Sequence, residues 1–217
     1  MDFKRARSDK HIQERIQEII SAAAKIYDSA GYDGLSFSAI SELTKFTRPT
    51  IYKYFNSKEE ILLKILLSDM EGWVLSLVDS FKINKIYSIE EISDIWVNTI
   101  TKNYRLLALY SMLFTSIEKN ASLDALVEFK KGFYVVTDKA MKLMVQLFPK
   151  TETSVLYSFL VNQLALALGM YPMSQLTELQ LKAHKASGIE HNTPDFKKSY
   201  KSTLYQLMYC LENGIGN

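Results

Sequence analysis

Apolar residues recur at helical spacing along almost the whole chain, and no stretch shows the sustained apolar–polar alternation that is typical of a β-strand. The 217 residues include only eight glycines and four prolines, which leaves few positions for tight turns. A chain of this length buries roughly 70% of the surface of its unfolded form. The sequence therefore predicts an all-α fold with a substantial core and excludes a many-stranded sandwich.

Cap signals divide the chain into successive helices. Gly31 ends the first predicted helix, and Ser38 and Thr47 are the predicted N-caps of the two short helices that follow. Ser57 and Glu60 match the S-x-x-E capping box at the start of a long helix. The predicted helices are 12–30, 39–45, 48–55, 57–81, 88–103, 104–115, 123–148, 152–171 and 194–213, with a linker at 173–193.

Residue types with catalytic or metal-binding chemistry are scarce. The single cysteine, Cys210, excludes an internal disulfide framework and a metal site built on several cysteines. None of the three histidines has a carboxylate pair or the cysteine at ligand spacing, and Gly31-x-x-Gly34 lacks the Lys-Ser/Thr that completes a phosphate-binding loop. We therefore expect no enzyme activity, no metal and no cofactor.

The sequence gives no indication of a signal peptide or a confident membrane span. The first five residues are polar, and no apolar stretch follows them. The longest uncharged stretch, residues 153–177, contains several polar side chains and Pro172. It is therefore predicted to be a helix buried within the protein or at a subunit interface rather than in a membrane. We expect a cytoplasmic protein.

Residues 38–61 carry the most informative pattern, two short capped helices joined by a tight turn. The predicted internal core of this segment consists of Ile40, Leu43, Phe46, Ile51 and Phe55. That core leaves Arg48, Thr50, Tyr52, Lys53 and Tyr54 facing outward, with no acidic residue between Arg48 and Lys58. A short helix with cations and hydroxyls on its outer face suits recognition of the DNA major groove.

The segment Phe37–Leu62 resembles the helix-turn-helix of TetR-family transcriptional regulators, most clearly from Thr50 to Leu62. The family's aromatic-x-x-Phe-x-x-Lys-x-x-Leu-like pattern is matched by Tyr52, Phe55, Lys58 and Ile61. Upstream, Ala22–Ala24, Tyr27, Gly31–Tyr32 and Leu35–Ser36 resemble the family's first helix and its exit loop.

The tight turn itself departs from the family pattern. Thr44 and Lys45 occupy the places where the family usually has a small residue and a glycine. Either Lys45 adopts an unusual backbone angle, or the turn has a different geometry.

The resemblance implies a fold with two domains and a function in transcription. Residues 1–60 would form a helix-turn-helix DNA-binding domain, and residues 61–217 a larger helical domain for ligand binding and dimerisation. The protein would be a sequence-specific repressor, released from a double-stranded DNA operator by a small-molecule inducer. The alternative is a helical interaction protein that does not bind DNA.

The resemblance also assigns site residues. Tyr52 and Lys58 would contact phosphates with Ser38 and Thr47 near the DNA backbone, and Arg48, Thr50, Lys53 and Tyr54 would approach base edges. An inducer pocket would be lined by aromatic residues of the middle helices, each of which has an ordinary core position as the alternative. These residues are Trp73, Trp96, Tyr104, Tyr110, Phe114, Phe133 and Tyr134.

A homodimer is expected to form through the last two long helices. Residues 152–171 are apolar nearly all round, which requires partners on more than one side. The predicted contact stripe on the final helix consists of Phe196, Tyr200, Leu204, Leu207, Met208 and Leu211.

Overall fold

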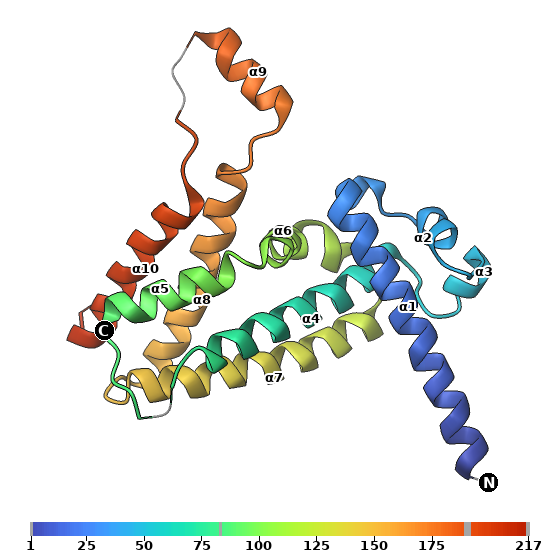
Figure 1. The fold of residues 1–217 in the computed structure, drawn as a ribbon, viewed down its shortest axis with the longest axis horizontal. Helices are drawn as coiled ribbons and strands as arrows, with labels where there is room; N and C mark the ends of the chain where they lie inside the picture. The colour runs from blue at the N-terminus through green and yellow to red at the C-terminus, as the bar shows by residue number, and fades with distance from the viewer. Residues whose placement is uncertain (1, 83, 189–191, 216–217) are drawn as a thin grey trace. The chain divides into compact units, whose positions relative to one another are not determined.

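The computed structural model describes residues 2–82, 84–188 and 192–215, with side chains from residue 10 onward, and this part of the chain contains helices and no β-strand. The predicted all-α class is therefore confirmed. In chain order (Figure 1) the elements are α1 (Asp2–Gly34), α2 (Phe37–Leu43), α3 (Arg48–Ile51), α4 (Lys58–Asp79), α5 (Ile89–Ile100), α6 (Tyr104–Met112), a π-helical turn η1 (Leu113–Ile117), a 3-10 turn η2 (Glu118–Asn120), α7 (Leu123–Leu147), α8 (Thr153–Met173), α9 (Glu178–Ser187) and α10 (Phe196–Asn213).

The chain packs as two compact units, and each unit is built from two separate segments. Unit 1 consists of residues 1–68 and 112–132, and unit 2 consists of residues 69–111 and 133–217. The first part of α7 therefore belongs to the same unit as the helix-turn-helix. The functional boundary that the sequence suggests near residue 60 remains a prediction.

Helix α2 begins two residues earlier than the sequence predicts. The side chain of Ser36, not that of Ser38, accepts a hydrogen bond from the backbone N–H of Ala39 and caps the helix. Its buried face is consequently formed by Phe37 and Ile40, three residues apart. Leu43 was predicted to point inward, but it lies in the last position of the helix and is 54% exposed.

The core of the helix-turn-helix otherwise follows the prediction. Ile40, Ile51 and Phe55 are buried, whereas Phe46 is half-buried. Helix α3 ends at Ile51 rather than at Phe55, and Phe55 reaches the core from the turn that follows it.

The core of unit 2 contains a chain of aromatic contacts around one buried amide. The ring of Trp96 lies edge-on to those of Trp73 and Phe159, with centroids 5.9 and 5.8 Å away. Its indole N–H donates to Oε1 of Gln163 at 3.2 Å, and the hydroxyl of Tyr200 donates to the same oxygen at 2.5 Å. Burial raises the pKa of the Tyr200 phenol, so this hydroxyl stays a donor.

The apolar stripe of α10 faces the core of its own subunit, which corrects the prediction that it forms the dimer contact. Its buried members are Phe196, Tyr200, Leu204, Met208 and Leu211, and α10 packs on α5 and α8. The exposed face of α10 instead carries Tyr205 and Tyr209, which are 40% and 47% exposed.

Helix α8 is long and apolar enough to span a membrane by length and composition alone. Only 22% of its apolar window is buried within the subunit. The inner face includes Leu156, Phe159, Gln163 and Ala167, while Tyr157 and Val161 are 61% and 48% exposed. An apolar face thus remains uncovered along α8.

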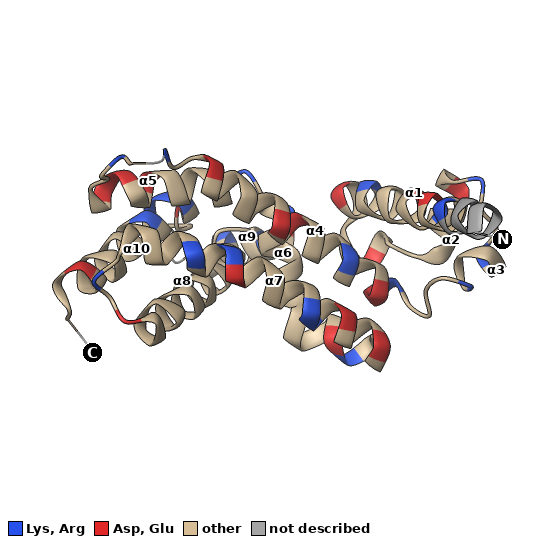
Figure 2. Ribbon diagram, turned by 90° about the horizontal axis from the view of Figure 1, so that it is seen from below, with Lys and Arg blue, Asp and Glu red and all other residues tan. Residues whose placement is uncertain are grey.

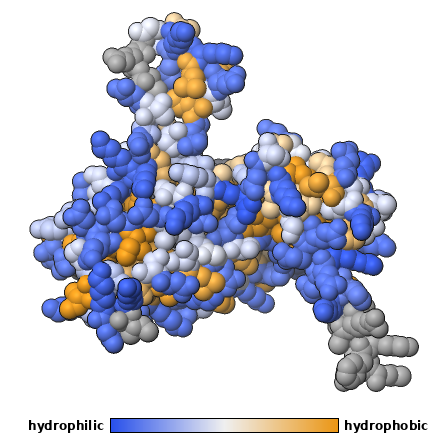
Figure 3. Space-filling model, in the orientation of Figure 1, coloured by the Kyte–Doolittle hydropathy of each residue, from blue (hydrophilic) through white to orange (hydrophobic). Residues whose placement is uncertain are grey.

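Helix α9 lies in the segment that the sequence predicted to be a linker. Thr177 and Gln180 form a capping box at its start, and Gly188 ends it with a left-handed backbone, φ 68°. None of its residues is buried, and it projects away from α8 and α10 (Figure 1). Apolar side chains lie on its exposed surface (Figure 3), including Leu179 and Leu181 at 76% and 51% exposure.

Candidate nucleic-acid interface

Helix α3 and its flanks present a surface without acidic residues. Residues 43–58 contain four cations, Lys45, Arg48, Lys53 and Lys58, and no Asp or Glu. Figure 2 shows the basic residues at the α2–α3 end of the chain. Such a surface attracts the phosphates of a nucleic acid, and its short helix presents side chains outward.

Arg48 and Ser38, both predicted DNA contacts, lie together across α2 and α3. The exposed guanidinium of Arg48 donates from Nη1 to the Ser38 hydroxyl at 2.9 Å. An arginine side chain has five N–H donors, so this bond orients the group and leaves donors for another partner. Pro49 occupies the first turn of α3, where its fixed φ sets the direction of the chain next to Arg48.

The two predicted threonines also meet. Thr47 is the N-cap of α3, but its hydroxyl bonds with the Thr50 hydroxyl at 3.0 Å rather than with a backbone N–H. Thr47 is exposed and Thr50 is half-buried.

The residues after α3 differ in how far they project. The ring of Tyr52 contacts Phe37 edge-on, with centroids 4.7 Å apart, yet the residue is 59% exposed. Lys53 is exposed, and Tyr54 is half-buried. Tyr52 and Lys53 are thus the members of this turn that stand furthest into solvent.

Lys58, at the start of α4, is held against Tyr32. Its ammonium lies 3.7 Å from the centre of the Tyr32 ring and donates to the Tyr32 carbonyl oxygen at 2.7 Å. An ammonium has three donors, so two remain for a phosphate. The Tyr32 hydroxyl donates to the buried Glu59 carboxylate at 2.5 Å, and this hydrogen bond, together with burial, raises the pKa of Tyr32 to about 12.

The turn between α2 and α3 takes the second of the two geometries left open by the sequence. Lys45 has no positive φ. Thr44 ends α2 in an extended conformation, φ −117°, and its hydroxyl donates to the Ile40 carbonyl and accepts from the Phe46 N–H. The threonine side chain thereby satisfies backbone groups that are left unpaired where the helix ends.

Glu60 is a buried carboxylate that the sequence analysis misassigned. The predicted capping box is half formed: the Ser57 hydroxyl accepts from the Glu60 N–H at 3.4 Å, but the Glu60 side chain does not return to Ser57. Its Oε2 accepts from the Asn56 N–H at 2.8 Å, and its Oε1 accepts from Asn56 Nδ2 at 3.0 Å and from the Ser122 N–H at 3.3 Å. Burial raises the pKa of Glu60, but hydrogen bonds from Ser122 and Asn56 outweigh it and hold the pKa below its ordinary value.

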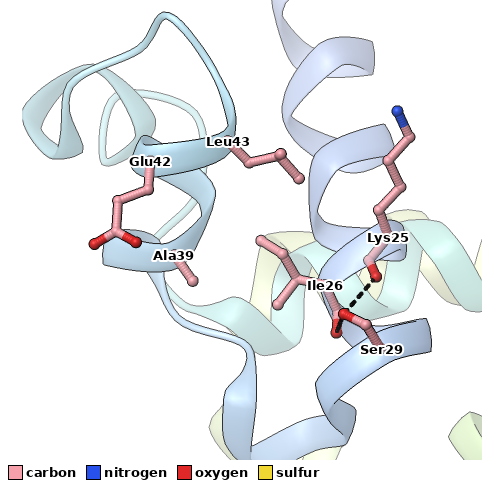
Figure 4. A pocket seen from close by; sticks show the side chains of 6 residues that line it. All are labelled: Lys25, Ile26, Ser29, Ala39, Glu42 and Leu43. Carbon is pink, nitrogen blue, oxygen red and sulfur yellow. Dashed lines mark hydrogen bonds between the residues drawn. The ribbon is translucent and has the colours of Figure 1, made fainter.

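A shallow hollow of about 470 Å³ lies between α1 and α2. Its lining, shown in Figure 4, consists of Lys25, Ile26, Ser29, Ala39, Glu42 and Leu43. The exposed Leu43 forms part of this wall.

The predicted ligand-binding aromatics occupy different environments. Trp73 and Trp96 are buried, and their indole N–H groups are bonded to Thr99 and Gln163. Tyr110 is buried, and Phe133 is half-buried with its ring 6.3 Å from that of Tyr110. Tyr104, Phe114 and Tyr134 are 50%, 58% and 74% exposed. Their role in binding a ligand remains a prediction.

No cluster of three metal-ligating side chains occurs within the described part of the chain.

Two family models match consecutive parts of the sequence. The model described as bacterial regulatory proteins, tetR family, matches residues 19–65. The model described as tetracyclin repressor-like, C-terminal domain, matches residues 67–212.

Individual relatives are distant. The HTH-type transcriptional repressor AcnR of Corynebacterium jeikeium (strain K411) is 26% identical over 88 residues, which are 41% of this chain and 47% of that protein. The match therefore spans about half the length of this relative. A crystal structure from Streptomyces coelicolor A3(2), of a protein thought to be a transcriptional regulator, aligns with a TM-score of 0.55 at 13% identity over 92% of this chain and 97% of that one. At this identity the likeness shows the fold alone.

The Glu60 hydrogen bonds make stability depend on pH. Because the folded-state pKa is lowered, the contribution of the carboxylate is present above its ordinary pKa of 4.5 and is lost as the pH falls through the folded-state value. We expect Glu60→Gln to lower the free energy of unfolding at pH 7 by about 1.5–3 kcal/mol, the range for hydrogen bonds to a charged group. Urea unfolding from pH 7 to pH 3 measures the difference, which shrinks at the acidic end.

Glu178→Gln is the matched control, because the Glu178 side chain is 92% exposed. It is expected to change the free energy of unfolding by less than about 0.5 kcal/mol at any pH. A difference between wild type and Glu60→Gln that stays constant down to pH 3 contradicts the assignment.

Proposed function

Because the chain belongs to the TetR family of bacterial transcriptional regulators, we propose that it is a repressor that a small molecule releases from its operator. The chain is a DNA-binding regulator of the helix-turn-helix class. Regulators of this family bind operators, dimerise and bind small-molecule ligands. The family is generally non-enzymatic, and we propose that this chain likewise has no catalytic activity and no cofactor.

The observation that carries the proposal is the acid-free surface of α3 on its buried core. Ile40, Ile51 and Phe55 fix the backbone, and Arg48, Tyr52 and Lys53 project from it. Phosphate contacts fix the position of a protein on DNA, whereas contacts to base edges provide sequence preference.

The proposed contacts divide into two groups. Tyr52 and Lys58 bind phosphates, with Ser38 and Thr47 near the DNA backbone. Base edges are approached by Arg48, Thr50, Lys53 and Tyr54. In the dimer, two α3 helices enter successive major grooves, so the operator is a near-palindrome with half-sites about one helical turn apart. Selection of bound fragments from random duplex DNA tests the function and supplies the operator.

Arg48→Ala is expected to change base preference. Pairing of the guanidinium with a guanine is worth about 1–3 kcal/mol of discrimination, so its loss relaxes the preference at one position of each half-site. Binding measured on every single-base variant of the selected operator reports this change.

Lys58→Ala is the matched comparison for Arg48→Ala. It removes a phosphate contact, so it weakens all operator variants alike and lowers the slope of affinity against salt by roughly one per contact. If Arg48→Ala also weakens every variant equally, Arg48 binds phosphate and the base-reading role passes to Thr50, Lys53 and Tyr54.

The proposed homodimer uses the uncovered faces of α8 and α10. The exposed face of α8 carries Tyr157, Val161, Ala165 and Gly169 at intervals of four residues, so its small members allow a close approach of a second helix. Tyr205 and Tyr209 of α10 extend the same kind of surface. A twofold arrangement of these helices buries both faces, and it supports a cytoplasmic protein in which α8 contacts a second subunit rather than lipid.

Val161→Glu is expected to convert a dimer at micromolar concentration into a monomer, because it buries four charges' worth of interface poorly only where the twofold axis pairs the α8 faces. Sedimentation of wild type and variant measures the change. Val135→Glu places the same charge at a valine on α7 that is 54% exposed and is expected to leave the dimer intact. A wild-type monomer, or a Val161→Glu dimer as stable as wild type, contradicts the proposed interface.

The inducer is proposed to bind in the helical body of the protein. The abundance of aromatic side chains there supports an apolar or flat ligand. The ligand releases the operator only if it binds the low-affinity state more tightly, and a coupling of about 1–3 kcal/mol changes operator affinity by about 5- to 150-fold. A thermal-shift screen followed by operator titration tests this part of the proposal.

A further inference from the structure

The beginning of α4 and the segment that leads into α7 are joined by four successive contacts, all within unit 1. The Ser57 hydroxyl donates to the Asn120 carbonyl at 2.9 Å, and Glu60 accepts from the Ser122 N–H. The other two contacts follow along the helices: an ion pair between Lys64 and Glu128, and a close approach of Leu67 to Gly132. Figure 1 shows these parts of α4 and α7 side by side.

The last contact leaves no room for a side chain. A Cβ atom at position 132 would lie 2.4 Å from Cδ2 of Leu67, so only glycine allows the two helices to come this close. The contacting residues of α4 are spaced three or four apart and therefore lie on one helix face.

Glu60 provides the most specific of the four contacts because it joins both segments to the end of the recognition turn. Asn56 follows the turn that carries Tyr52 and Lys53, and both its backbone and side-chain N–H groups donate to the Glu60 carboxylate. Ser122 directly precedes α7, and its hydroxyl caps that helix by accepting from the Ala125 N–H. The carboxylate thus lies at the N-terminal ends of α4 and α7, where both helix dipoles favour a negative charge.

We propose that Glu60 is a positioning residue for DNA recognition that holds the recognition turn on the start of α7. Segment 112–132 is then a structural part of the DNA-binding unit, although it follows the helix-turn-helix by more than fifty residues. This role rests on the proposed function. It adds that residues of α7, which carry no DNA-facing group of their own, set the operator affinity.

The test compares operator binding by variants on the two sides of the contact. The probe is the duplex that wild type selects from random DNA, and affinity is measured where circular dichroism shows each full-length variant folded. Glu60→Gln offers a single acceptor oxygen where three N–H groups converge. Ser122→Pro removes only the N–H donor, and the preceding Ala121 already has the extended backbone that a residue before proline favours.

Both single variants are expected to weaken operator binding about tenfold, the effect of losing one hydrogen bond to a charged group. The double variant is expected to be no weaker than either single variant, because both changes break the same contact. Ser122→Ala keeps the N–H group and is expected to bind within about threefold of wild type. Glu71→Gln breaks the Lys139–Glu71 ion pair of unit 2 and serves as the control that leaves affinity unchanged.

A purely structural role would lower the melting temperature without changing the affinity of the folded protein. Folded Glu60→Gln and Ser122→Pro variants that bind the selected duplex as tightly as wild type therefore overturn the proposal. If Glu60→Gln does not fold, Ser122→Pro and Asn56→Ala decide the question, since each leaves the carboxylate in place. A wild-type protein that selects no duplex at all is a different result and overturns the proposed function itself.

Discussion

A buried carboxylate with three N–H donors holds unit 1 together. Removing a carboxylate from water is costly unless hydrogen bonds replace its hydration. Asn56 and Ser122 supply these bonds to Glu60, and their effect on its pKa exceeds that of burial. The same three bonds connect the end of the helix-turn-helix to the start of α7, so the charge is accommodated only when both chain segments are in place.

The recognition surface depends on this support because α3 has little stability of its own. A four-residue helix has too few backbone hydrogen bonds to form alone. Ile51 and Phe55 anchor it from within, and Asn56 fixes the point where the chain leaves it. The side chains proposed to meet DNA therefore project from a backbone whose position is determined on both sides.

The sequence predicted the parts of the fold that depend on local pattern. The helix-turn-helix core at Ile40, Ile51 and Phe55, the stop at Gly31 and the long helices all follow from spacing and cap residues. Leu43 was misplaced because Ser36 and Ser38 are equally good caps by sequence, and only tertiary packing of Phe37 selects the earlier one. The capping box at Ser57 failed in part because Glu60 has partners 62 residues away, which no local pattern reveals.

Surface assignments were harder for a related reason. The stripe on α10 is apolar whether it faces its own subunit or a second one, and only its packing on α5 and α8 shows which. Helix α9 has good cap signals, Thr177 with Gln180 and Gly188, but too few apolar residues to be distinguished from a linker by periodicity. Arg48 and Ser38 were assigned from resemblance, and the structure adds the hydrogen bond between them.

The most direct test of the account is native-state hydrogen exchange at two amides of the full chain, those of Asn56 and Ser122. Both donate to Glu60, and the account holds that they open only when unit 1 opens. It predicts that the two amides exchange with the same free energy, and that Glu60→Gln lowers both values together. A Ser122 amide that exchanges at the rate of an exposed loop, while Asn56 stays protected, would contradict the claim that the two segments form one DNA-binding unit.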